Sequence, residues 1–256
     1  MTLIARTMEF VSEIEDILLE HVKNNYPVDW DENFITRSLL KEIRHRLGSV
    51  FVADLQHRTR IDWVPYKLSG TPENKFGDIA ILVNIRYQDG DGIEGVAFLE
   101  AKKRNQKETE FGAIKTEQLE NILKNAPSSM MLLYDYDDIT QFVDFIPSKG
   151  PWLRGWKYKP CTCAVTVPLT LVSNTRKRDM TLYKFSLPFS YQLVFRYFQG
   201  LDLEFQKNPI QIAKGYASDK GLPTYLVAVS VAYGKVKPEV IEFNKELFTE
   251  IGEDYG

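Results

Sequence analysis

The stretch GDIAILVNIRYQDGDGIEGVAFLEAK, residues 77–102, decides the expected fold. Two runs rich in Ile and Val flank the segment DGDG at 89–92, and Asp-Gly steps between such runs are typical of a β-hairpin. If the chain reverses at Asp89, residues at equal distances before and after it face each other across the two strands. This register predicts that Asp78 and Glu100 lie side by side at the open end of the hairpin.

Strand alternation places Lys102 on the same face as these two acids. Like charges directly opposite each other are destabilising unless something compensates them. A hard divalent cation does so, and carboxylate oxygens suit Mg²⁺, for which Mn²⁺ could substitute. Lys102 could then orient or deprotonate a metal-bound water and stabilise charge on a scissile phosphate. The alternative is an ordinary hairpin edge, because an E-x-K triplet is common.

Working outward from the hairpin, apolar periodicity predicts the neighbouring elements. Helical spacing appears at 9–22, 31–47 and 114–124, and a period of two appears near 50–55, 76–87, 93–102 and 130–136. This order indicates an α/β fold in which a mixed sheet is flanked by helices.

The second half continues with further strands and helices. We expect strands at 162–172, 180–187 and 225–233, and helices at 189–205 and 239–250. Since no linker separates the halves, we expect one domain over 1–256, with a core at about 31–140 and a C-terminal α+β elaboration at about 150–256.

Composition narrows the class of protein. The 256 residues carry a formal net charge of -3, so any nucleic-acid contact must rely on local basic patches. The two cysteines, Cys161 and Cys163, are too few for a disulfide framework or a zinc site and suggest a reducing compartment. The longest apolar run, at 225–233, is too short to span a membrane, and we expect a cytoplasmic protein.

Gly77-Asp78 followed by Glu100-Ala101-Lys102 resembles the bipartite motif of the PD-(D/E)XK nuclease superfamily, which has the restriction-endonuclease-like fold. The resemblance implies metal-dependent hydrolysis of phosphodiester bonds. It also implies that Asp78, Glu100 and the carbonyl of Ala101 hold the metal and that Lys102 supports the attacking water. Gly77 stands where the motif's name has Pro. The family core implied for 31–136 is a helix, a three-stranded meander, a crossover helix and a fourth strand.

Two further residues follow from the resemblance. Some members add an acid from the helix before the meander, for which Glu42 is the candidate, although it could instead pair with Arg46 one turn later. Other members use a Gln from the following helix, for which Gln118 is the candidate. The alternative is that Gln118 simply lies on a solvent-exposed flank of that helix.

Basic side chains lie close to the proposed site. The residues that could track nucleic-acid phosphates, or simply form solvated faces, are Arg37, Lys41, Arg44, Lys103 and Arg104. The acidic run at 134–138 could be a second metal site or a loop after a strand.

The leading hypothesis is a Mg²⁺-dependent DNA endonuclease of a prokaryotic restriction or anti-phage defence system. The alternative is a non-catalytic or latent subunit that binds nucleic acid or a partner protein within a larger complex. A homodimer that cuts both strands would fit the first hypothesis.

Overall fold

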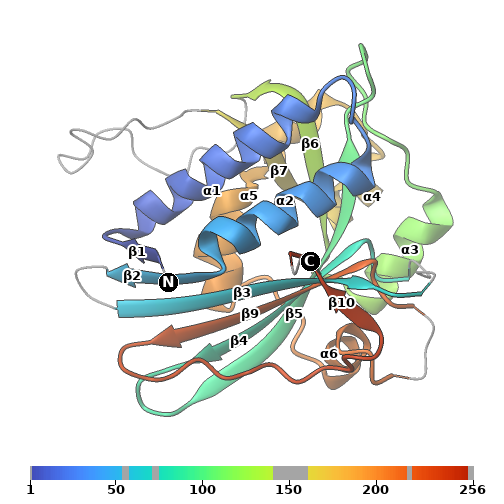
Figure 1. Ribbon diagram of the computed structural model, residues 1–256. Helices are drawn as coiled ribbons and strands as arrows, with labels where there is room; N and C mark the ends of the chain where they lie inside the picture. The colour runs from blue at the N-terminus through green and yellow to red at the C-terminus, as the bar shows by residue number, and fades with distance from the viewer. Residues whose placement is uncertain (1, 54–57, 71–74, 141–160, 218–220, 253–256) are drawn as a thin grey trace.

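The computed structural model describes residues 2–53, 58–70, 75–140, 161–217 and 221–252 (Figure 1). Within them, ten strands form one sheet in the order β1-β2-β3-β9-β4-β5-β6-β7-β8, with β10 pairing beside β3. The strands are β1 Thr2–Ile4, β2 Ser49–Ala53, β3 Arg58–Leu68, β4 Ile79–Arg86, β5 Gly92–Lys103, β6 Met130–Ile139, β7 Thr162–Pro168, β8 Leu187–Pro188, β9 Tyr225–Tyr233 and β10 Phe248–Glu250. The α-helices are α1 Thr7–His21, α2 Glu32–Leu47, α3 Thr116–Asn125, α4 Leu169–Thr175, α5 Phe189–Tyr191 and α6 Lys207–Ala213. The expected mixed sheet flanked by helices is confirmed.

Helices cover both faces of this sheet. Figure 1 shows α1 and α2 across one face and α6 on the opposite side of β4 and β5. Side chains of β4 alternate between the two cores, since Ile79 and Ile81 pack beneath α1 and α2 whereas Ala80 and Leu82 pack toward α6. None of the described helices is long and apolar enough to cross a membrane.

The hairpin of β4 and β5 has the expected register. Ala80 pairs with Phe98 and Leu82 with Val96, as the reversal at Asp89 predicts. At the turn, the Tyr87 N–H donates to the carbonyl of Asp91 at 2.8 Å. The positions of Asp78 and Glu100 therefore follow from the turn chemistry of this segment.

The expected three-stranded meander is interrupted by β9. This strand lies between β3 and β4, antiparallel to the first and parallel to the second. Its sequence, YLVAVSVAY, is buried along almost its whole length, as is typical of a central strand covered on both faces. A segment expected to belong to a C-terminal elaboration thus lies in the middle of the sheet.

Strand β3 was not expected from the sequence, and Pro65 explains why. Proline cannot donate a ladder hydrogen bond and normally argues against an interior strand. Here β2 pairs with β3 only as far as Asp62, and β10 begins pairing at Tyr66. Pro65 lies between these two pairings, and its carbonyl faces that side, where it accepts from Ile251 N–H at 2.9 Å. The N–H that Pro65 lacks would therefore point to a gap between two paired strands, and no sheet hydrogen bond is lost.

Three other expectations were wrong in the second half. Residues 180–187 form a 3₁₀ helix, Met180–Phe185, because Asp179 caps the N–H of Thr181 at 2.8 Å. The strand expected at 162–172 ends at Pro168, where α4 begins. Residues 239–250 form no helix, since Ile241 and Phe243 alternate in the manner of an extended chain before β10. The helix expected at 189–205 is α5 continued by a π turn and a 3₁₀ turn as far as Gln199.

Candidate active site

The open end of the β4–β5 hairpin carries Asp78 and Glu100. Asp78 N–H donates to the Leu99 carbonyl at 2.8 Å, and Asp78 Oδ2 accepts from Ala101 N–H at 3.0 Å. Gly77 has φ of +92°, and a Cβ at this position would lie 2.7 Å from the Leu99 carbonyl oxygen. Glycine is therefore required before Asp78, which accounts for the absence of Pro at this point.

The ammonium group of Lys102 lies among the oxygens of this site. Lys102 Nζ is 2.8 Å from Glu100 Oε1, 3.9 Å from Asp78 Oδ2 and 2.6 Å from the Ala101 carbonyl oxygen. Its side chain is only 11% exposed. Lys102 thus lies inside the cluster rather than at an exposed strand end.

Glu32 is the fourth charged member, and the sequence analysis did not identify it. It lies in the first turn of α2, which Asp31 caps by accepting from Phe34 N–H at 3.0 Å. Glu32 Oε1 is 3.3 Å from Lys102 Nζ. The signal that could have found it is the acid directly after a helix N-cap, at the end of the helix that abuts the hairpin opening.

Glu42 does not reach the site. It is ten residues beyond Glu32 on α2, or about 15 Å along the axis. There it pairs with Arg46 at 2.6 Å, His45 at 3.5 Å and His21 at 3.8 Å. The structure therefore favours the surface pairing of Glu42 and places the helix acid of the site at Glu32.

Gln118 does reach the site. It lies in α3, and its Nε2 donates to Glu100 Oε1 at 3.0 Å. Glu100 Oε1 therefore accepts from Gln118 and from Lys102. Glu100 Oε2 is buried and has no hydrogen-bond partner among the described residues.

Burial and mutual repulsion perturb the ionisation of these groups. Burial, followed by the Asp78 charge, raises the pKa of Glu100 from 4.5 to about 7. Burial also raises the pKa values of Asp78 and Glu32. For Lys102, burial alone would lower the pKa, but Glu100, Glu32 and Asp78 outweigh it and the pKa is raised. Three carboxyl groups thus share one ammonium group, so that full ionisation leaves excess negative charge.

These side chains line a cavity of about 540 Å³. Its lining also includes Lys67 of β3, Tyr225 at the start of β9 and Thr224 just before it, none of which the sequence analysis singled out. Tyr225 donates from its hydroxyl to the carbonyl of Asn33 at 3.2 Å and so joins β9 to the start of α2. The insertion of β9 into the sheet therefore completes one wall of the cavity.

Of the five basic candidates, Arg44 and Arg104 are held by contacts within the protein. Arg37 and Lys41 are exposed on α2, and Lys103 is half-buried beside the site. Arg44 instead pairs with Glu250 at 3.0 Å and donates to the Trp63 carbonyl at 3.2 Å.

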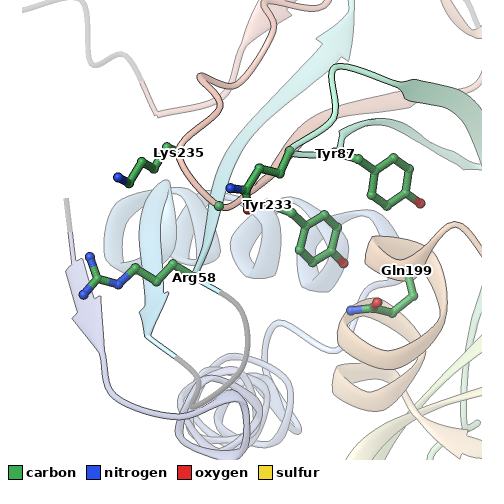
Figure 2. Close-up of a pocket in the computed structure, with 7 residues that line it drawn as sticks. Arg58, Tyr87, Gln199, Tyr233 and Lys235 are labelled. Atoms are coloured by element: carbon green, nitrogen blue, oxygen red, sulfur yellow. The ribbon is translucent and has the colours of Figure 1, made fainter.

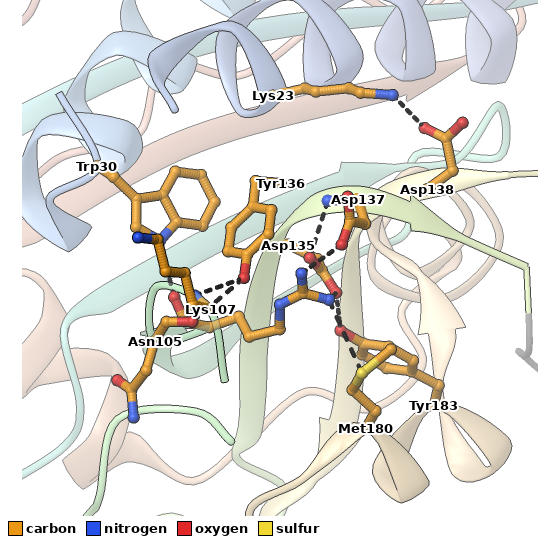
Figure 3. Close-up of polar contacts among 11 residues, drawn as sticks. Lys23, Trp30, Asn105, Lys107, Asp135, Tyr136, Asp137, Asp138, Met180 and Tyr183 are labelled. Atoms are coloured by element: carbon orange, nitrogen blue, oxygen red, sulfur yellow. Dashed lines mark hydrogen bonds and ion pairs between the residues drawn. The ribbon is translucent and has the colours of Figure 1, made fainter. Parts of the chain in front are cut away.

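Arg104 is buried in a separate network. Figure 3 shows its partners Asp135, Tyr136 and Asp137 together with Tyr183. The Arg104 guanidinium lies 3.0 Å from Asp135, pairs with Asp137 and stacks 3.8 Å from the ring centre of Tyr136. Tyr183 donates a hydrogen bond to the same carboxylate of Asp135. This arrangement excludes Arg104 as a surface phosphate contact. The acidic run at 134–138 lies within β6, and its Asp135 and Asp137 hold an arginine, so the run is neither a loop nor a metal site.

A search against known protein families, curated proteins and solved structures found no match to the chain. Two carboxylates and a carbonyl offer hard oxygen ligands, although no set of three or more His, Cys, Asp or Glu residues within the described ranges is arranged to hold a metal ion. Mg²⁺ needs only one or two carboxylates, with waters and substrate phosphates as its other ligands. The orphaned Oε2 of Glu100 and the excess of negative charge fit such a cation.

Proposed function

We propose that this chain is a divalent-cation-dependent nuclease of the PD-(D/E)XK type that hydrolyses phosphodiester bonds in DNA. The observation that carries the proposal is the meeting of Asp78, Glu100 and Lys102 in one cavity, with Glu100 Oε2 buried and unpartnered among the described residues. Buried carboxylates that repel each other require either protons or a cation. Their order and spacing along the chain match the motif that the sequence resembles.

Asp78, Glu100 and the Ala101 carbonyl would hold the cation, with Mg²⁺ preferred. A bound Mg²⁺ supplies Lewis-acid stabilisation of charge on the phosphoryl group and makes water more acidic. The chain itself fixes the ligands, because Ala101 N–H holds Asp78 and Gln118 holds Glu100.

Lys102 acts as a cationic hydrogen-bond donor in this proposal. In the metal-free protein the surrounding carboxylates raise its pKa, so the ammonium group is protonated at neutral pH and can donate hydrogen bonds to a water or to a phosphate oxygen. We therefore assign Lys102 to orienting water and to stabilising charge on the phosphate. Glu32 keeps the ammonium group at the site through its contact at 3.3 Å.

The proposed substrate, DNA, is a polyanion whose phosphates would contact basic side chains around the cavity. Lys67 is exposed and lines the cavity, and Arg37 lies near enough to the Tyr225 hydroxyl to influence its pKa. These two side chains, with Lys103, are the phosphate contacts that we propose. The setting implied by the resemblance is prokaryotic restriction or anti-phage defence.

The test is cleavage of supercoiled plasmid, linear duplex and single-stranded DNA with Mg²⁺, with Mn²⁺ and with EDTA. We expect cleavage that needs the metal and that is lost in Glu100→Gln and strongly reduced in Glu32→Gln. Glu42→Gln is the matched control, because it removes an acid of the same helix outside the cavity. If wild type and Glu100→Gln cleave alike, catalysis at this cavity is refuted. If neither cleaves until a partner protein is added, the latent-subunit alternative is favoured.

A further inference from the structure

A second cavity lies at the other end of the same strands (Figure 2). It encloses about 740 Å³, within the range of about 300–1,000 Å³ that is typical of small-molecule sites. Tyr87 follows β4 and Tyr233 ends β9, whereas Asp78 and Tyr225 lie at the opposite ends of these strands. The eight residues of β4 span about 25 Å, so this cavity is separate from the acidic one.

Two tyrosine rings form one end of this cavity. The rings of Tyr87 and Tyr233 are stacked, with centroids 5.6 Å apart and planes 4° from parallel. The Tyr233 hydroxyl donates to the Phe198 carbonyl at 3.1 Å, which fixes that ring. The Tyr87 hydroxyl has no partner among the described residues. The result is a rigid, half-buried aromatic surface with one hydroxyl available.

Two cations lie at the other end. Figure 2 shows Arg58 and Lys235 on one side of the cavity and the two tyrosines with Gln199 on the other. The carbonyl of Arg58 accepts from Gly234 N–H at 2.6 Å, which joins the start of β3 to the turn after β9 and sets the two cations beside each other. Within the part of the chain that the structure describes, neither cation has a carboxylate partner.

Amide groups complete the lining. Gln88 and Gln199 are exposed side chains that can each donate and accept hydrogen bonds. Gly234 has φ of +76°, and a Cβ there would lie 2.7 Å from Gln88 Oε1. The glycine therefore leaves room for Gln88 over the turn.

We propose that this cavity binds a nucleotide. An aromatic surface suits a planar base, amides suit the polar edge of the base, and paired cations suit a phosphate at the far end of the same ligand. A simple anion would not need the tyrosines, and an apolar ligand would not need the cations. The inference does not depend on the nuclease activity of the acidic cavity.

The test is isothermal titration calorimetry of the full chain in EDTA, which suppresses metal-dependent binding at the acidic cavity. AMP, GMP, CMP and UMP are compared with adenosine, which lacks phosphate, and with ribose 5-phosphate, which lacks a base. We expect at least one nucleotide to bind tenfold or more tightly than either fragment. Arg58→Gln, Lys235→Gln and Tyr87→Leu should each weaken that binding at least fivefold.

The matched controls are Lys207→Gln and Tyr216→Leu, which change an exposed lysine and an exposed tyrosine outside the cavity and should leave the affinity unchanged. Arg58 and Lys235 are exposed, so their variants are expected to fold even if Tyr87→Leu does not. The proposal is overturned if no nucleotide binds, if ribose 5-phosphate binds as well as the nucleotides, or if only an oligonucleotide binds. It is also overturned if nucleotides bind but Arg58→Gln and Lys235→Gln have no effect.

Discussion

Replacing Glu100 by Gln should abolish cleavage and yet stabilise the metal-free protein at alkaline pH. The pKa of Glu100 rises from 4.5 to about 7 on folding, mainly through burial, and the side chain is 1% exposed. Because a tenfold change in acidity corresponds to about 1.4 kcal/mol, holding this carboxylate ionised costs the folded state up to about 3 kcal/mol above pH 7. Gln has nearly the same shape and can still accept hydrogen bonds from Gln118 and Lys102, but it carries no charge.

The sign of this stability difference follows from proton binding at Glu100. Between pH 4.5 and 7 the folded state binds more protons at Glu100 than the unfolded state does, so its contribution to stability falls as pH rises through that window. Thermal unfolding in EDTA should therefore give a higher Tm for Glu100→Gln at pH 8, by about 5–10 °C, and little difference at pH 4.5. Mg²⁺ should raise the Tm of wild type and not that of the variant.

The control is Glu42→Gln, for which the change in Tm at neutral pH should have the opposite sign. The pKa of Glu42 is lowered, since its hydrogen bond from Arg46 and the neighbouring histidines outweigh burial. Its loss should therefore destabilise the protein at neutral pH rather than stabilise it. A Glu100→Gln variant that is no more stable than wild type at pH 8, or a difference that is independent of pH, would refute the reasoning about the cavity's charge.

Three further predictions follow from named contacts. Arg104→Ala should destabilise the fold by about 3–5 kcal/mol in urea unfolding, because it leaves Asp135 buried without its cation, whereas the exposed Arg176→Ala should change stability little. Gly77→Ala should lower the Tm and reduce cleavage, since φ of +92° and the Leu99 carbonyl leave no place for a Cβ, and normal cleavage would contradict the strict backbone geometry assigned to Asp78. Lys67→Ala should weaken binding to duplex DNA and reduce the slope of log affinity against log salt by about one, and an unchanged slope would remove Lys67 from the DNA interface.

Local chemistry made the hairpin part of the site predictable. The Asp-Gly turn sets the register of β4 and β5, whose last pair, Ile79 with Leu99, brings the adjoining Asp78 and Glu100 to the same end of the hairpin. Gln118 was identified from the family resemblance, and in the structure its Nε2 donates to Glu100 Oε1 at 3.0 Å. These features depend on residues that are close in sequence.

The rest of the site depends on long-range packing. The choice between Glu32 and Glu42 requires knowing which end of α2 meets the hairpin, and helical periodicity is the same at both ends. The sequence of β9 indicates a buried strand but carries no signal for its neighbours, so its place between β3 and β4 could not be predicted. Arg104 follows the Lys-rich end of the motif but turns toward Asp135 on β6, a partner 31 residues away.

The central claim is that Asp78 and Glu100 share a catalytic cation. Crystals of the protein soaked in Mn²⁺, measured at a wavelength where manganese scatters anomalously, test this most directly. The account predicts one anomalous peak in contact with both carboxylates in wild type and none there in Glu100→Gln. A wild-type map without a peak at these carboxylates, or with Lys102 still bridging them at saturating Mn²⁺, would contradict it.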